Sequence, residues 1–285
     1  MTPSFPLADR VLAQRLERAE AESNRRFVEA RARVAPESQA VWMTDGGAYA
    51  MFDGVESPLT QTFGLGMFEP VTDAQVERIE AFFDERGAAT FHEVSPLADP
   101  SALAVLIGRG YAPFEFTNVL YQPVSGSVPP ISPGFQVRLA EASEQEAWAR
   151  ASAAGWSEFP ELEAFMLGFG RVAAVCQGAL PFVAEIDGRI VATASMVVHD
   201  GVAVLAGAST IPAARGRGAQ SALLSARLRM AVSRGCDVAA MGAQPGSGSQ
   251  RNAERNGFRI AYTRLKWRRS APARRLKKSG SRPID

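Results

Sequence analysis

The sequence predicts an α/β (α+β) protein of two similar domains, because it contains both a linker-like stretch and an internal repeat. Residues 124–134 are rich in Pro, Gly and Ser, carry no charge and show no hydrophobic periodicity, which is typical of a linker. On either side of this stretch, two short patterns recur at a nearly constant separation. Arg86-Gly87 corresponds to Arg234-Gly235, and Arg109-Gly110-Tyr111 corresponds to Asn256-Gly257-Phe258. A constant separation of this kind indicates two copies of one fold.

These observations divide the 285 residues into five segments. We expect an N-terminal helical segment (1–37), a first domain (38–123), the linker (124–134), a second domain (135–269) and a basic tail (270–285). Apolar residues recur in a partly helical pattern between residues 8 and 35, which suits a helix that covers a domain or contacts another chain. The tail is rich in Arg and Lys and poor in apolar residues, so we expect it to be disordered.

The second half alternates strands and helices. Hydrophobic periodicity predicts strands at residues 135–141, 180–186, 189–199, 202–211, 236–243 and 258–267, and helices at 143–156, 161–176, 219–234 and just before Gly257. Asp187-Gly188 between two β-rich runs predicts a hairpin. In the helix at 219–234, apolar residues at four-residue spacing predict the face that packs on the sheet, with Arg227 elsewhere on the helix. These apolar residues are Leu224, Leu228 and Val232.

The most informative stretch is Arg215-Gly216-Arg217-Gly218-Ala219-Gln220, which joins a predicted strand to a predicted helix. The first-turn N–H groups of a helix have no partner within the helix, and the helix dipole places positive potential there. Glycines before such an N-terminus let an anion approach the backbone closely. The stretch therefore predicts a binding site for a phosphate group.

Together with Asn256-Gly257-Phe258, which closes a short helix before the last strand, this loop resembles the GNAT superfamily of acyl-CoA-dependent N-acyltransferases. Arg215 and Gly218 fit the loop of that family, whereas Gln220 stands where the family has a small residue. The resemblance implies two GNAT-like domains, each a mixed, mostly antiparallel twisted sheet flanked by helices.

The first domain resembles the family more weakly. We align its residues 69–74 with the glycine loop of the second domain. Glu69 and Asp73 stand there in place of a glycine pair, and their carboxylates would repel a pyrophosphate. We therefore expect a degenerate domain that binds no coenzyme.

The resemblance also implies that acetyl-CoA is the co-substrate and that no metal is needed. In this family the strand before the loop holds the pantetheine arm by backbone hydrogen bonds, and the loop holds the pyrophosphate. The corresponding residues here are Ser209, Thr210, Ile211, Arg215, Gly216, Arg217, Gly218, Ala219 and Gln220. Ser249 and Asn252, on the short helix that follows, are further candidates for orienting the coenzyme.

The sequence assigns no catalytic residue. Ala253 stands where the family often has a Tyr that protonates the departing thiolate, and the strand at 202–211 lacks the carboxylate found in many members. The candidates are Glu158 and Glu161, in the connection between two helices that lines the acceptor pocket of the family, and Tyr262 on the last strand. The alternatives are that the two Glu residues are surface charges and that Tyr262 is a packing residue.

Composition narrows the class of protein. Lys and Arg number 31 against 30 Asp and Glu, so the net charge of +1 argues against a nucleic-acid binder. No apolar run approaches the roughly 20 residues of a membrane span, and the N-terminus lacks a signal-peptide pattern, so we expect a cytoplasmic protein without a membrane partner. Cys176 and Cys236 are the two cysteines, too few for a disulfide framework or a metal cluster.

These inferences predict an N-acetyltransferase that transfers an acetyl group to a primary amine of a small molecule or peptide. The amine attacks the thioester directly within a ternary complex, and a homo-oligomer is compatible with the sequence. The missing Tyr and the missing strand carboxylate support an alternative from another class, a sensor or scaffold that binds acetyl-CoA without turnover. A role with nucleic acid rests on the basic tail alone.

Overall fold

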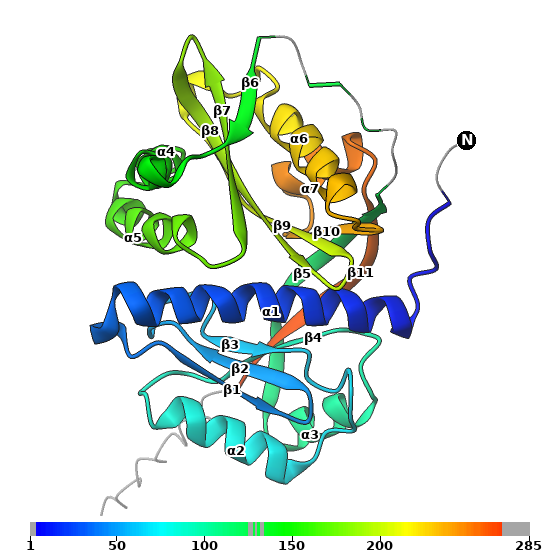
Figure 1. The fold of residues 1–285 in the computed structure, drawn as a ribbon. Coiled ribbons are helices and arrows are strands. Elements are labelled where there is room, and N and C mark those ends of the chain that lie inside the picture. The colour runs from blue at the N-terminus through cyan, green and yellow to red at the C-terminus, as the bar shows by residue number, and fades with distance from the viewer. Residues whose placement is uncertain (1–3, 125–127, 129, 132–133, 270–285) are drawn as a thin grey trace, which may run out of the picture.

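The computed structural model describes residues 4–124, 128, 130–131 and 134–269. The basic tail at 270–285 and part of the linker lie outside the described residues. The described chain forms a mixed α/β fold, in which helices flank one large, mostly antiparallel sheet (Figure 1). The fold class predicted from the sequence is confirmed.

The secondary structure of the second half follows the predicted order. The first half contains α1 (Arg10–Val34), β1 (Val41–Asp45), β2 (Ala48–Phe52), β3 (Gln61–Phe63), α2 (Asp73–Asp84), β4 (Phe91–Val94), α3 (Ser101–Gly108) and β5 (Tyr111–Pro123). The second half contains β6 (Gln136–Leu139), α4 (Gln145–Ala154), α5 (Glu163–Ala174), β7 (Ala179–Ile186), β8 (Arg189–His199), β9 (Val202–Thr210), α6 (Ala219–Ser233), β10 (Val238–Ala243), α7 (Gly248–Arg255) and β11 (Arg259–Arg269). Short 3-10 turns precede α4, α5 and α6: η2 (Ala142–Glu144), η3 (Pro160–Leu162) and η4 (Pro212–Ala214). No helix in the described part of the chain combines the length and the apolar character that crossing a bilayer requires.

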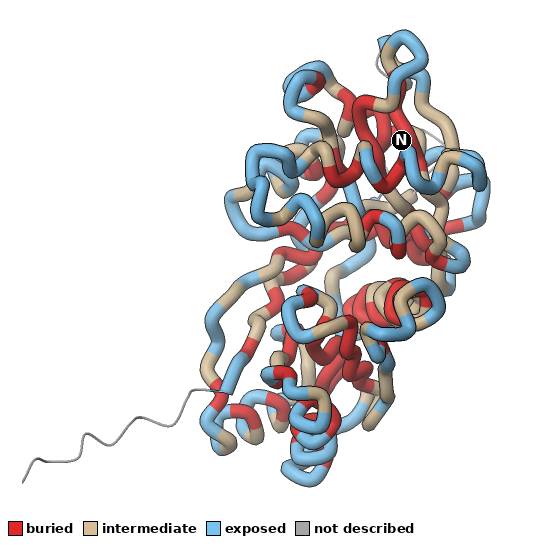
Figure 2. The backbone as a smooth tube through the Cα atoms, turned by 90° about the vertical axis from the view of Figure 1, so that its left-hand side faces the viewer, coloured by how far each residue is buried: buried red, intermediate tan, exposed pale blue. Residues whose placement is uncertain are grey.

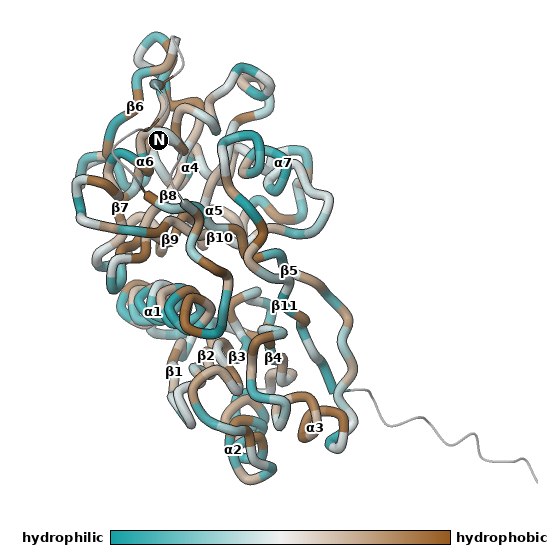
Figure 3. The backbone as a smooth tube through the Cα atoms, turned by 90° about the vertical axis from the view of Figure 1, so that its right-hand side faces the viewer, coloured by the Kyte–Doolittle hydropathy of each residue, from teal (hydrophilic) through white to brown (hydrophobic). Residues whose placement is uncertain are grey.

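The described strands form one eleven-stranded sheet in the order β1-β2-β3-β4-β11-β5-β10-β9-β8-β7-β6. Each half places its last strand next to the other half, because β11 lies between β4 and β5, and β5 lies between β11 and β10. Figure 3 shows β5 and β11 running together from one half to the other. The two halves are therefore joined through the sheet as well as through the linker.

The last strand of each half, β5 or β11, is long enough to pair with strands of both halves. β5 pairs with β11 along nearly its whole length, and its last six residues, 118–123, also pair with β10. On its other side, β11 pairs with β4 from Leu265 to Arg268. Sequence order places residues 258–267 in the second half, but it carries no information on these partners, which are fixed by contacts between distant segments.

Helices cover both faces of the central strands. On one face, Leu16 of α1 packs in one core cluster with Val202 and Val204 of β9. On the other face, Leu223 of α6 packs with Leu205, the next residue along the strand. Successive side chains of a strand point to opposite faces, so α1 and α6 lie on opposite sides of β9.

The helix α1 crosses the middle of the molecule, between the two halves (Figures 1 and 2). It begins after Asp9, which caps its first turn. Arg10 donates a hydrogen bond to the carbonyl of Met67 in the first half, and Arg15 pairs with Asp237 in the second half at 2.6 Å. The N-terminal helix therefore contacts both halves of the chain.

A buried group of charges anchors α1 to the sheet. Arg264 on β11 is 1% exposed, and its Nη1 lies 2.8 Å from Glu20 and 3.4 Å from Glu17 of α1. Its Nε lies 3.5 Å from Glu93 of β4. Tyr262 donates its hydroxyl to Glu17 at 2.8 Å. Burial raises the pKa of Glu17 to about 7, in opposition to the lowering effect of the Arg264 charge.

One prediction for α6 is wrong. Val232, expected to face the sheet, is 38% exposed, whereas Arg227, expected elsewhere on the helix, is 3% exposed. A helix turns about 100° per residue, so a position eight residues after Leu224 has rotated about 80° away from it, while positions three and four residues on stay close to its side. The buried face therefore runs through Leu224, Arg227 and Leu228.

Candidate functional site

The site begins where β9 and β10 separate. The two strands pair in parallel over residues 238–240 of β10, although β10 continues to Ala243 and β9 to Thr210. Residues 206–208 of β9 are exposed in the middle of the sheet. Because β10 does not pair with this edge of β9, the backbone N–H and C=O groups of residues 206–208 are available to an extended ligand.

A β-bulge in β9 turns this edge away from β10. Relative to β8, β9 contains one extra residue between Ala206 and Ser209. Gly207, within the bulge, has φ +61°, a left-handed conformation that glycine adopts without strain. A bulge bends its strand and increases the local twist, which opens the gap between β9 and β10.

The glycine loop lies at one end of this gap. Residues 215–218 lead from η4 to α6, with Gly216 at φ +72° and Gly218 at φ +96°. Gly218 is the N-cap residue of α6 and has no side chain to bond to the first-turn N–H groups. The first turn of α6 and the exposed edge of β9 line the same cavity. An anion in this cavity therefore meets free N–H groups and the positive end of the helix dipole.

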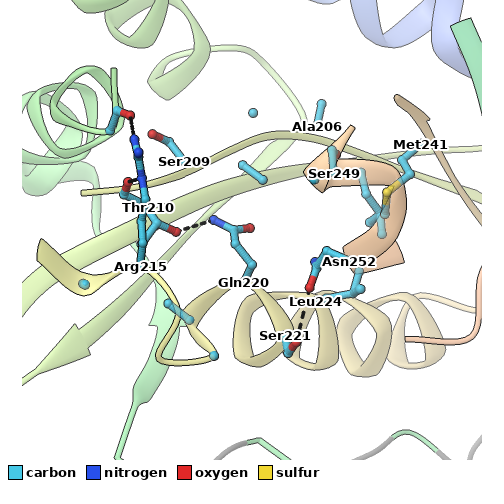
Figure 4. A pocket seen from close by; sticks show the side chains of 18 of the residues that line it. Ala206, Ser209, Thr210, Arg215, Gln220, Ser221, Leu224, Met241, Ser249 and Asn252 are labelled. Carbon is cyan, nitrogen blue, oxygen red and sulfur yellow. Dashed lines mark hydrogen bonds between the residues drawn. The ribbon is translucent and has the colours of Figure 1, made fainter. Parts of the chain in front are cut away.

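The cavity has a volume of about 710 Å³, which is in the usual range for small-molecule sites. Figure 4 shows it between β9, α6 and α7, with Leu224 on α6 and Met241 on β10. The segment that follows α4 closes another side with Gly155, Trp156, Glu158 and Phe159. Strands β9 and β10, helices α6 and α7, and the segment after α4 thus contribute to one hollow.

Most of the predicted coenzyme residues lie together. The cavity is lined by Ser209, Thr210, Arg215, Gly216, Gly218, Ala219, Gln220, Ser249 and Asn252. Ile211 and Arg217 line a second hollow, of about 510 Å³, with residues of the β7–β8 turn. The role of all these residues in coenzyme binding stays a prediction.

Arg215 holds the wall of the cavity. Its guanidinium donates hydrogen bonds to the carbonyls of Gly155 at 2.6 Å and Thr210 at 3.3 Å, and it pairs with the carboxylate of Glu158. In Figure 4 its side chain extends from the loop toward the segment after α4. Arg215 therefore fixes that segment beside the glycine loop, which leaves backbone N–H groups as the donors to an anion.

Two polar pairs order the helical side of the cavity. Gln220 donates to the hydroxyl of Thr210 at 2.7 Å, and Ser221 donates to Asn252 at 3.4 Å (Figure 4). The long side chain of Gln220, at a position where the family has a small residue, thus ties the first turn of α6 to the end of β9. Ala253 is fully buried in the core and does not line the cavity, so Asn252 is the neighbouring α7 side chain that reaches it.

The structure places one of the three catalytic candidates in the cavity. Glu158 is the one carboxylate-bearing residue among the described residues that line it. Glu161 lies in η3, is exposed and is not part of the lining. Tyr262 is 7% exposed and bonds to Glu17 in the buried charge cluster, again outside the lining.

The first half differs at the corresponding place. Residues 69–74 end in the first turn of α2, which is capped by Thr72, whose hydroxyl accepts the N–H of Gln75 at 3.2 Å. A glycine with positive φ, Gly66, lies closer to the end of β3 than the segment that we aligned from the sequence. Its carbonyl accepts a hydrogen bond from Arg10 of α1 at 3.5 Å. A side-chain cap and a covering helix thus replace the open loop of the second half.

Sequence reasoning missed the walls supplied by other segments. Trp156 and Phe159 are 39% and 48% exposed, with ring centroids 6.5 Å apart, and both line the cavity. Arg227 of α6 and Arg255 of α7 line it as well. The sequence does offer one signal for this wall, the two aromatic residues on either side of Glu158 near a predicted connection, because connections between elements often carry binding residues.

A family model matches this part of the chain. Residues 144–258 match the model of the acetyltransferase (GNAT) family. The resemblance to this family inferred from the sequence is confirmed for this part of the chain. The matched range contains the separated strands, the glycine loop and α7, so the cavity lies entirely within the GNAT domain. No curated protein matches the chain at a significant level.

Solved structures match both halves together. A GCN5-related N-acetyltransferase from Kribbella flavida is 20% identical, with 87% of this chain and 95% of that chain covered and a TM-score of 0.61. A tandem GNAT protein from the clavulanic acid biosynthesis pathway is 13% identical, with 92% and 96% covered and a TM-score of 0.57. A GCN5-related N-acetyltransferase from Sphaerobacter thermophilus is 19% identical, with 78% and 76% covered and a TM-score of 0.55. The described chain therefore has the fold of a tandem GNAT protein.

Proposed function

We propose that this protein is an acyl-CoA-dependent N-acyltransferase that binds its coenzyme A ester in the cavity of the GNAT domain. The acceptor is a primary amine of a small molecule or peptide, and acetyl-CoA is the simplest donor. The observation that carries the proposal is the presence, in one cavity, of an uncapped helix N-terminus and an open strand edge. Phosphate oxygens suit the first, and the amides of a pantetheine arm suit the second.

The residues along the cavity fit such an ester. Gly216, Gly218 and the first turn of α6 would hold the pyrophosphate through backbone N–H groups. Residues 206–208 would bind the pantetheine arm as an added strand, and Asn252 would orient it from α7. Arg255 adds a positive charge to the same lining. These are all groups that bind an anionic, extended molecule and need no metal partner.

Coenzyme A supplies an activated thioester, and the residues of this chain supply position and a proton acceptor. An amine attacks only in its neutral form, so a proton must leave it. Glu158 is our candidate for the proton acceptor, because it is the carboxylate in the described lining. Trp156 and Phe159 flank it and offer an apolar wall that orients the acceptor and excludes water.

We further propose that residues 38–123 form a degenerate GNAT-like domain and residues 135–269 the functional one. Titration calorimetry with acetyl-CoA should then give one molecule bound per chain. The physical reason is that Thr72 caps the first turn of α2 and α1 covers the carbonyls after β3. A stoichiometry of two at comparable affinity would show that the first half keeps a coenzyme site.

We expect Glu158→Gln to lower kcat for amine acetylation by about a hundredfold, the usual size of a general-base contribution. The Kd for acetyl-CoA should stay within about twofold of the parent value, because the amide keeps the shape of the side chain and the coenzyme loop is unchanged. The measurement is free-thiol release from acetyl-CoA with a panel of amines and amino acids.

Two variants serve as controls for this result. Glu161→Gln and Tyr262→Phe alter the other two sequence candidates, which the structure places outside the cavity, and both should keep the parent kcat. A loss of turnover in either, with normal turnover in Glu158→Gln, would contradict the assignment. If acetyl-CoA binds but no amine releases thiol, the sensor or scaffold alternative is favoured.

A further inference from the structure

Arg227 is a buried cation without an anionic partner among the described residues. It is 3% exposed, and its hydrogen bonds go to two main-chain carbonyls, those of Leu223 and Ser195, each at 3.3 Å. A guanidinium carries five N–H donors, so these two bonds leave donors unused. Burial lowers the pKa of Arg227 to about 10, which reflects the cost of holding this charge away from water.

Arg264, the other buried arginine among the described residues, is paired, and so is the half-buried Arg31. Arg264 lies among three carboxylates, and Arg31 bonds to Asp53 at 2.9 Å. Buried charges in proteins are normally paired in this way, because an isolated one is strongly disfavoured. Arg227 departs from this pattern, and it lines the cavity of the GNAT domain, where a ligand can reach it.

The position of Arg227 separates it from the phosphate-binding end of the cavity. It lies eight residues after Ala219 on α6, about 12 Å along the helix axis at 1.5 Å per residue. The carbonyl that it contacts belongs to Ser195, which pairs with Ala206, the first exposed residue of the open β9 edge. Arg227 therefore lies near the inner end of the gap between β9 and β10, whereas the glycine loop lies at the other end.

Apart from the hydroxyl of Ser249, which lies near Ala206 and Met241 in Figure 4, the lining near the inner end is mainly apolar, and the described lining there offers Arg227 no carboxylate. Leu205, Leu224 and Met241 contribute hydrocarbon and sulfur to it, and none of them neutralises a charge. Consider a coenzyme A ester whose phosphates bind the glycine loop and whose thioester lies between β9 and β10. Its acyl chain, which extends beyond the thioester, would then reach Arg227. An acyl chain that ends in a carboxylate would supply the missing anion.

We propose that the preferred donor is a short dicarboxylic acyl-CoA, of the malonyl or succinyl type, whose distal carboxylate binds Arg227. The inference rests on the proposed function and changes only the acyl group. The amine nitrogen forms the new C–N bond, the C–S bond breaks, one proton leaves the amine and coenzyme A departs as the thiol. The distal carboxylate takes no part in the reaction and holds the acyl chain in place by a charge-assisted, bidentate contact.

The test compares two donors of equal chain length, succinyl-CoA and butyryl-CoA, which differ by a carboxylate in place of a methyl group. Titration calorimetry on the full chain should show succinyl-CoA binding at least tenfold more tightly. In Arg227→Met the two Kd values should become equal through a loss of affinity for succinyl-CoA alone. Arg227→Lys, which keeps the charge, should retain part of the preference.

Arg255→Met is the matched control, because it removes a different arginine from the same lining. This variant should bind both donors more weakly by the same factor and should preserve the preference for succinyl-CoA. Equal binding of the two donors by the parent protein would overturn the inference and leave the proposed function intact. A loss of butyryl-CoA affinity in folded Arg227→Met would also overturn it, because Arg227 would then contact a part common to all donors. If no coenzyme A ester binds at all, the proposed function itself fails.

Discussion

Gly218→Glu is expected to weaken acetyl-CoA binding at least a hundredfold, a loss of about 2.7 kcal/mol. Gly218 is the N-cap of α6 and has φ +96°, in a cavity where we place the pyrophosphate. A glutamate there adds a side chain where backbone must approach the ligand, and a negative charge that repels it. Titration calorimetry on the variant, with circular dichroism to show that it is folded, measures the effect.

The matched control is Gly235→Glu, just after the other end of α6. Gly235 has φ +70° and open space where a Cβ would stand, so this change introduces the same charge and a similar backbone strain far from the loop. Its affinity for acetyl-CoA should equal that of the parent protein. If folded Gly218→Glu binds acetyl-CoA with the affinity of the parent protein, the coenzyme does not bind in this cavity.

The glycine loop could be found from the sequence because all its parts are local. A β-rich run, two glycines and a helix N-terminus follow one another directly, and each has its own physical signal. The strands and helices of the second half are local in the same sense. The placement of β5 and β11 beside strands of the other half has no local signal. It depends on pairs such as Leu265 with Val94, which lie far apart in the chain.

The contacts between side chains in the site could not be predicted from the sequence either. Arg215 was expected beside a phosphate, but its partners include Gly155 and Glu158, and no local pattern marks those contacts. The sequence pattern places Arg227 away from the buried face of α6, because residues at a strict four-residue spacing rotate gradually around the helix. A charged residue on a buried face contradicts the hydrophobic pattern, and such contradictions tend to occur where a ligand or partner completes the environment.

The charge cluster at Arg264 connects the fold to the site. Its Nη2 lies 3.8 Å from the point where a Cβ would stand on Gly242, and Gly242 lines the cavity. The cluster therefore lies against the β10 wall, and it joins α1 and β4 of the first half to β11 of the second. Loss of the cation would affect both the docking of α1 and the support of this wall.

We expect Arg264→Met to lower the free energy of unfolding by about 3–5 kcal/mol, the usual cost of removing one partner from a buried ion pair. Methionine fills much of the space but leaves Glu17, Glu20 and Glu93 without their cation. Urea denaturation measures the loss. The control is Arg268→Met on the same strand, where the guanidinium is exposed above the ring of Phe114, and it should change stability by no more than about 0.5 kcal/mol.

The pH dependence of this loss separates a charge effect from a packing effect. In the parent protein the folded pKa of Glu17 is about 7, above its ordinary value of 4.5, so this group favours folding below pH 4.5 and the benefit is lost as the pH rises through 7. Removal of Arg264, which lowers that pKa, raises it further, so the variant continues to lose stability above pH 7, where the parent has levelled off. The difference in unfolding free energy between parent and Arg264→Met should therefore be larger at pH 9 than at pH 6. A difference that does not change with pH would mean that Arg264 stabilises the fold by filling space, and that its charge contributes little.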